Sequence, residues 1–68
     1  MKLEWKDGFT VRVRVVRNQV VISANREGLL SLQQQLAVLA GETPGSHIHY
    51  DDSNSLEEGS VQLIIEKE

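Results

Sequence analysis

Residues 9–24, FTVRVRVVRNQVVISA, decide the fold because their apolar and polar side chains alternate with the period of a β-strand. The apolar side chains of the first half share one face, which carries Phe9, Val11, Val13 and Val15. Asn18 favours a turn position with positive φ, which predicts a two-residue loop at 17–18 or 18–19. Either loop places the apolar residues of the second half on that same face, namely Val20, Ile22 and Ala24.

The preceding residues 3–9, LEWKDGF, carry a second turn signal. A three-residue loop at 6–8, with Gly8 in the left-handed conformation, sets Trp5 opposite Phe9 and Leu3 opposite Val11. We therefore expect a short strand before the turn and a sheet that begins near residue 3.

Residues 25–41, NREGLLSLQQQLAVLAG, predict one helix over about 26–40. Asn25 suits the N-cap, and Gly41 suits a left-handed C-terminal cap. The apolar stripe at helical spacing contains Leu29, Leu32, Leu36, Leu39 and Ala40, so residues 33–35, all glutamine, are expected to face outward. Glycine in a helix interior lowers the stability of the helix by about 1 kcal/mol relative to alanine. The presence of Gly28 therefore indicates a position at which the helix approaches the sheet too closely for a side chain.

Two further strands are expected after the helix, within HIHY (47–50) and SVQLIIEK (60–67). The predicted fold is a single α+β domain over residues 1–68, in the order β-β-β-α-β-β. One mostly antiparallel sheet is covered on one face by the helix. On the open face, an apolar patch of Val16, Val21 and Ile64 would suit a homodimer interface, although β-branched residues also simply favour strands.

Composition limits the classes of function. The chain has 68 residues, no cysteine and a formal net charge of −3, so neither a disulfide nor a cysteine-bound zinc supports its small core. The acidic balance opposes a general nucleic-acid binder. The N-terminus resembles no signal peptide, and no apolar run approaches the roughly 20 residues that span a bilayer. We expect a cytoplasmic protein without a nucleic-acid or membrane partner.

His47 and His49 are the sharpest chemical signal, because residues two apart in a strand share a face and two imidazoles could chelate one metal ion. Asp51 is in phase with them as a third ligand. The alternative is a strand with Ile48 and Tyr50 in the core and the imidazoles outside. No nucleophile elbow, phosphate loop or paired-carboxylate cleft is recognisable, so we predict no catalytic residue and no cofactor.

An acidic loop follows this strand, with four carboxylates within eight residues: Asp51, Asp52, Glu57 and Glu58. Like charges so close repel one another, and a cationic partner would relieve that repulsion and be steered toward the loop. The alternative interpretation is an ordinary solvated loop of turn-forming and charged residues.

The chain from residue 20 to residue 67 resembles the Imm32 family of bacterial immunity proteins. The matching features are NREGL (25–29), the leucine and alanine stripe of the helix, GSHIH (45–49) and the closing LEEGSVQLIIEK (56–67). The resemblance implies a small cytoplasmic α+β protein of a polymorphic toxin system that binds and blocks a cognate toxin. It implies no catalytic residue.

The leading hypothesis is therefore a non-enzymatic immunity protein that occludes a toxin with a cationic surface. The expected partner-binding residues are Asp51, Asp52, Glu57, Glu58, His47 and His49. The alternatives are a small homodimeric structural or regulatory domain using Val16, Val21 and Ile64, and a metal-binding module using His47 and His49.

Overall fold

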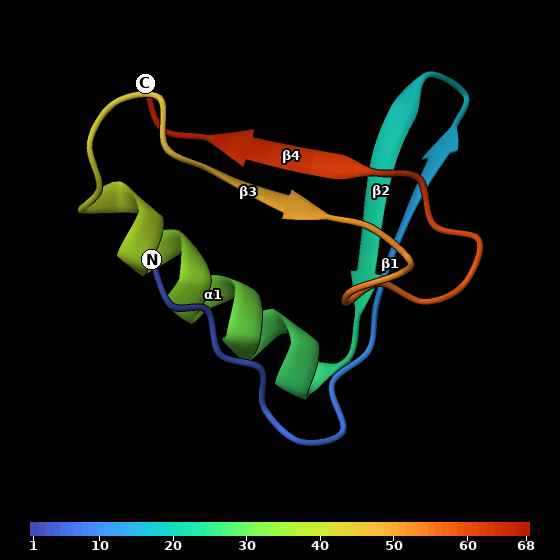
Figure 1. Ribbon diagram of the computed structural model, residues 1–68. Helices are drawn as coiled ribbons and strands as arrows, with labels where there is room; N and C mark the ends of the chain where they lie inside the picture. The colour runs from blue at the N-terminus through green and yellow to red at the C-terminus, as the bar shows by residue number, and fades with distance from the viewer.

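The computed structural model describes all 68 residues and contains four strands and one helix. They run in the order β1 (Val11–Val16), β2 (Gln19–Ala24), α1 (Arg26–Ala40), β3 (His47–Tyr50) and β4 (Leu63–Glu66) (Figure 1). The α+β class is confirmed, but the single five-stranded sheet is wrong. β1 pairs with β2, β3 pairs with β4, and these are two separate antiparallel sheets. Helix α1 is neither long nor apolar enough to cross a membrane.

The N-terminal segment explains why the predicted first strand is absent. The turn itself is present, because Phe9 N donates to Lys6 O and Gly8 has a φ of 78°. Trp5 also stacks on Phe9, with ring centroids 4.2 Å apart. The backbone of the segment, however, bonds to side chains of α1, since Lys6 N donates to Ser31 Oγ at 2.9 Å. The segment therefore lies along the helix and not at the edge of a sheet.

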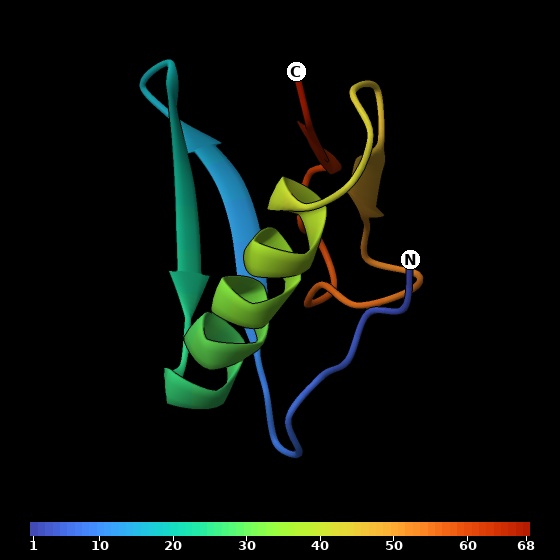
Figure 2. The same cartoon turned by 90° about the vertical axis from the view of Figure 1, so that its left-hand side faces the viewer.

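The β1–β2 hairpin has the predicted register, but its predicted core face is covered only at the base. Arg17 and Asn18 have φ values of 52° and 63°, which makes the loop a two-residue type I′ turn. Val11 and Val13 are buried. Towards the tip, on the same face, the exposed fractions are 56% for Val15, 62% for Val20 and 42% for Ile22. Figure 2 shows the reason: the hairpin diverges from α1, so one helix of 15 residues cannot cover its outer half.

A backbone connection joins the two sheets. Glu57 N donates to Val11 O and Val61 N donates to Val13 O, both at 2.9 Å, and Val13 N donates to the hydroxyl of Ser60. The loop between β3 and β4 therefore pairs with the edge of β1 that β2 leaves free. β1 is bonded on both sides, while β2 is bonded on one.

The helix spans the predicted residues 26–40, but its C-terminal cap has a different conformation. Asn25 Oδ1 accepts from Gly28 N at 2.8 Å, which confirms the N-cap. Gly41 has a φ of −90° and a right-handed conformation, so the predicted left-handed cap is wrong. A Cβ on Gly28 would collide with the Thr10 carbonyl oxygen and lie 3.1 Å from Ala24 Cβ, which confirms the close approach of helix and hairpin.

The buried face of α1 is more polar than the leucine stripe predicts. It consists of Gly28, Ser31, Gln35 and Leu39, while Leu29 and Leu36 are exposed. The prediction that Gln35 faces outward is wrong, because its side chain bonds to Tyr50 and to the N-terminal segment. The apolar core gathers around this face and comprises Val11, Val13, Leu39, Ile48, Tyr50 and Leu56.

Candidate functional site

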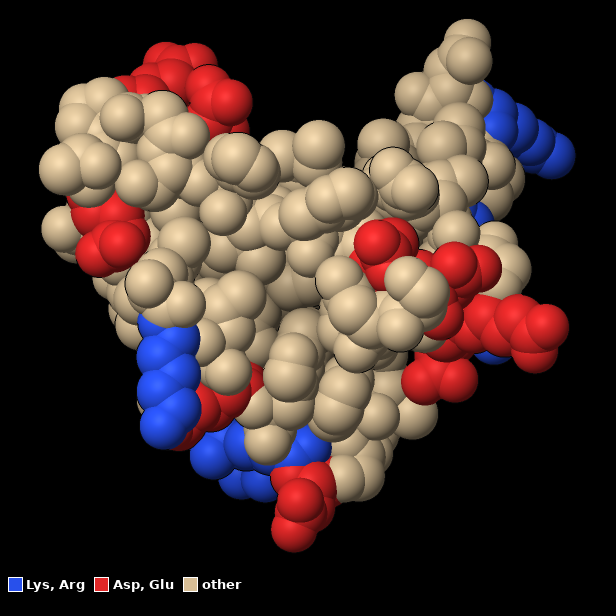
Figure 3. All heavy atoms as spheres, in the orientation of Figure 1, with Lys and Arg blue, Asp and Glu red and all other residues tan.

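The loop between β3 and β4 is the candidate functional site. It crosses from the end of β3 to the free edge of β1 and then returns to form β4 (Figure 1). Its acidic side chains gather on one side of the molecule, below the tip of the hairpin (Figure 3). Leu56, in the middle of the loop, is buried in the core. Its burial anchors the loop to the core.

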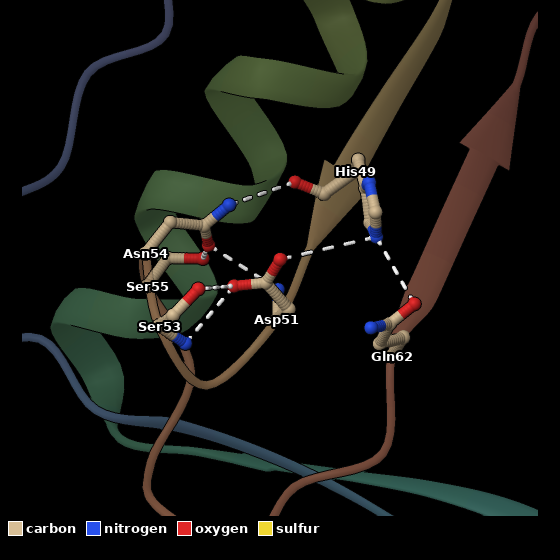
Figure 4. A network of polar contacts seen from close by, with 6 residues as sticks. All are labelled: His49, Asp51, Ser53, Asn54, Ser55 and Gln62. Carbon is tan, nitrogen blue, oxygen red and sulfur yellow. Dashed lines mark hydrogen bonds and ion pairs between the residues drawn. The ribbon is translucent and has the colours of Figure 1, made fainter.

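Asp51 begins the loop and is held by its neighbours. Its Oδ1 accepts hydrogen bonds from the Ser53 hydroxyl at 2.7 Å and from Ser53 N at 2.9 Å (Figure 4). Its carbonyl oxygen accepts from the backbone N–H of Leu56 at 2.9 Å. The hydrogen bonds from the side chain and then the backbone of Ser53 lower the pKa of the Asp51 carboxyl below its usual value, assisted by the nearby His49. This carboxylate shapes the loop.

The other three carboxylates are available to a partner. Asp52 and Glu58 are exposed, and Glu57 is half-buried. Asp52 makes one long bond, in which Gly59 N donates to its Oδ2 at 3.3 Å. Because the Glu57 backbone is bonded to β1, these negative charges are presented on a segment whose path is already defined.

His49 stands at the junction of β3 and this loop. Its Nε2 lies 3.9 Å from Asp51 Oδ2 and 3.3 Å from Gln62 Oε1 (Figure 4). The backbone carbonyl of His49 accepts from the Asn54 side chain at 3.4 Å. The structure thus brings His49 and Asp51 together, as their spacing in the sequence predicts.

His47 lies two residues away on the same exposed face of β3, while Ile48 and Tyr50 point into the core. Its Nδ1 is 3.4 Å from Gly45 O, and its register partner on β4 is Glu66. This orientation is the one expected of outward imidazoles on a strand. No group of three or more histidine, aspartate or glutamate side chains is arranged to hold a metal ion, so the predicted trio with Asp51 does not assemble.

The predicted apolar patch is divided between the two sheets. Val16 and Val21 lie on the outer face of the hairpin, whereas Ile64 lies on β4 opposite His49. Val16 and Ile64 are both exposed. Because the sheet is not continuous, the three residues do not share the single face from which the patch was deduced.

The sequence pattern missed the largest exposed apolar group of the hairpin, which consists of Val15, Val20 and Ile22. Alternation identifies the face of a strand but not how far along the strand that face is covered. The lengths of the strands could have indicated this exposed group. Two six-residue strands present more apolar surface than a single helix that diverges from them can cover.

The fold is a small α+β domain with two antiparallel sheets and one helix. Its acidic loop, which is bonded to the free edge of β1, displays a charged surface. Residues 19–68 match the family Imm32, Immunity protein 32. The match covers most of the chain, and the protein belongs to this family of immunity proteins. It begins at the first residue of β2, so β1 lies outside it. No curated protein and no solved structure matches the chain.

Proposed function

We propose that this protein is a non-enzymatic immunity protein that binds a cognate toxin in the cytoplasm of the producing cell and blocks it. The observation that carries the proposal is membership of the Immunity protein 32 family over residues 19–68. The acidic loop supports it as the contact surface, because it presents carboxylates on a defined backbone.

Charge determines which partner this loop suits. The net charge is −3, and Asp52, Glu57 and Glu58 add three negative charges within one loop. A toxin with a cationic surface would be steered toward the loop, and an ion pair would relieve the repulsion among the carboxylates. His49 lies beside the loop, and His47 extends the proposed contact surface along β3, while Asp51 maintains the shape of the loop.

The loop is also prepared for binding by its internal bonds. Ordering a flexible segment costs free energy at the moment of association, and a loop that is already ordered avoids that cost. The buried Leu56 and the bond from Glu57 N to Val11 O order the loop before a partner arrives. Occlusion of the toxin's functional surface would then need no movement of this protein.

The test is co-expression with the toxin encoded by the neighbouring gene, followed by a binding titration with the purified proteins. The triple variant Asp52→Asn, Glu57→Gln and Glu58→Gln is expected to weaken binding by about 10-fold or more and to slow association at low salt. Rescue of the cells should fall in parallel.

The matched control removes three charges elsewhere, with Glu4→Gln, Asp7→Asn and Glu68→Gln, all at exposed positions. It changes the net charge equally and should leave binding nearly unchanged. If both triple variants lose affinity equally, the loop has no specific role. If the unaltered protein neither binds nor rescues, the proposed function itself is wrong.

A further inference from the structure

Strand β2 has one edge without a partner. β1 pairs with β2 on one side and with the loop at residues 57–61 on the other, but β2 pairs with β1 alone. Figure 2 shows β2 at the outer margin of the fold. In a two-residue hairpin, the two residues that flank the loop bond to each other through both backbone N–H and C=O groups, and so does every second pair along the strands. The residues of the pairs in between point these groups away from the partner strand. Val20, Ile22 and Ala24 therefore direct their N–H and C=O groups away from β1.

This edge lacks the features that normally prevent strands from pairing with other chains. Exposed edges are usually protected by charges, prolines, bulges or very short strands. The sequence of β2, QVVISA, contains no charge and no proline, and its six residues pair with β1 in a continuous register. β1 carries Arg12 and Arg14, and β4 carries Glu66. β2 is thus a neutral strand with an open edge.

We propose that β2 pairs in antiparallel orientation with β2 of a second copy of this chain, so that the two hairpins form one four-stranded sheet across a two-fold axis. A closed two-fold dimer requires the same patch on both copies. In antiparallel strands, the side chains of two paired residues point to the same face of the sheet. A two-fold axis perpendicular to the sheet therefore passes between two copies of one residue, and this residue sets the register of the dimer.

Backbone hydrogen bonding selects Ile22 as that residue. With Ile22 opposite Ile22 of the second copy, Val20 lies opposite Ala24, and all the outward-directed N–H and C=O groups of these three residues find partners. With Val21 on the axis, Ala24 would lie opposite Asn18, which belongs to the turn and has a φ of 63°. That register leaves part of the edge unpaired.

The side chains favour the same arrangement. Val20 and Ile22 lie on one face and are exposed in the single chain, and pairing brings Ile22 against Ile22 and Val20 against Ala24 of the second copy. No like charges meet, because β2 is neutral.

A second copy suits this edge better than the toxin, because the strand is self-complementary and uncharged, whereas the surface of this protein proposed to bind the toxin is acidic. The two surfaces use opposite edges of the hairpin, although Glu57 of the acidic loop lines a hollow with Ser23 and Ala24 of β2. The acidic loop is bonded to the far edge of β1, so a dimer through β2 leaves it open. The dimer does not rest on the proposed function, and each can fail without the other.

The first test is the mass in solution. Sedimentation or light scattering is expected to give twice the chain mass of 7.6 kDa. Ile22→Lys places two ammonium groups opposite each other and should weaken the dimer by about 100-fold or more. Ile22→Pro removes an outward N–H that the hairpin does not use, and it should also give monomers that keep their circular dichroism. Val15→Lys is the matched control, since Val15 is also exposed on the same face, to 56% against 42% for Ile22, but lies on β1.

The second test is cross-linking, which is simple because the chain has no cysteine. Cα atoms of a hydrogen-bonded pair lie about 5.5 Å apart, within the range that a disulfide spans. Ile22→Cys is expected to form a covalent dimer on mild oxidation faster than Val21→Cys. Faster linking by Val21→Cys would overturn the register.

The dimer itself is overturned if the unaltered chain sediments as a monomer, or if Val15→Lys dissociates it as fully as Ile22→Lys. A monomer whose β2 amides become protected from hydrogen exchange only when the toxin is added would instead assign the edge to the toxin.

Discussion

The hydroxyl of Tyr50 donates a 2.8 Å hydrogen bond to Oε1 of Gln35, and both side chains are 1% exposed. Gln35 Nε2 in turn donates to the Glu4 carbonyl oxygen at 2.8 Å. One amide therefore joins β3, α1 and the N-terminal segment. No buried side-chain nitrogen or oxygen in the protein lacks a partner, so this polar connection through the core is complete.

Replacing this amide should be costly. Gln35→Leu is expected to lower the free energy of unfolding by about 2 kcal/mol, because the Tyr50 hydroxyl and the Glu4 carbonyl oxygen lose their partner. Gln34→Leu, one residue away and exposed, should change it by less than about 0.5 kcal/mol. Urea denaturation followed by tryptophan fluorescence measures both. Equal effects would mean that the bond to Tyr50 contributes nothing specific.

Ionisation of Tyr50 should be coupled to unfolding. Burial raises the pKa of the Tyr50 hydroxyl above its usual value near 10. The folded state thus favours the neutral phenol, and its contribution to stability is complete below about pH 10 and is lost as the pH rises through the raised pKa. The chain has a single tyrosine, so tyrosinate absorbance reports Tyr50 alone. Titration at the usual pKa in a folded chain would contradict the burial argument.

Gly28 should resist substitution although it lies in a helix. Alanine favours a helix interior by about 1 kcal/mol, but the new Cβ would meet the carbonyl oxygen of Thr10. Gly28→Ala is therefore expected to destabilise the protein by about 1–3 kcal/mol. Gly41→Ala is the control, since its nearest contact is 3.6 Å away and its backbone is already helical. Thermal denaturation of the two variants should separate them, and a stabilised Gly28→Ala protein would exclude the collision.

Acid should weaken the β3–β4 loop through Asp51. Its pKa is lowered, chiefly by the bonds from Ser53, so its contribution to stability is present above about pH 4 and is lost as the pH falls through the lowered value. Asp51→Asn should reduce both the melting temperature at neutral pH and its decrease on acidification. Asp52→Asn, whose carboxylate makes one long bond, is the control and should leave both nearly unchanged.

Local signals in the sequence predicted the elements whose structure depends on neighbouring residues. The turn at Arg17 and Asn18 requires positive φ, and Asn25 caps the helix that follows it. Both depend on contacts within a few residues or across one hairpin, which periodicity and turn chemistry describe well.

Contacts between distant residues were not predictable in this way. The pattern of Leu3 and Trp5 fits both a strand and an irregular segment packed on a helix. The structure contains the packed segment, because the side chains of Ser31 and Gln35 bond to the backbone of this segment. For the site, the sequence predicted the position of the acidic loop but not the separate role of Asp51. That role depends on how the backbone turns to bring Ser53 onto the carboxylate.

The bond between Val13 N and the Ser60 hydroxyl joins residues 47 apart in a chain of 68. Contacts of such long range slow folding, because loop-closure entropy must be overcome before they contribute. We expect the hairpin and helix to form first and the acidic loop last, so the surface proposed to meet the toxin is the last part of the fold to become complete.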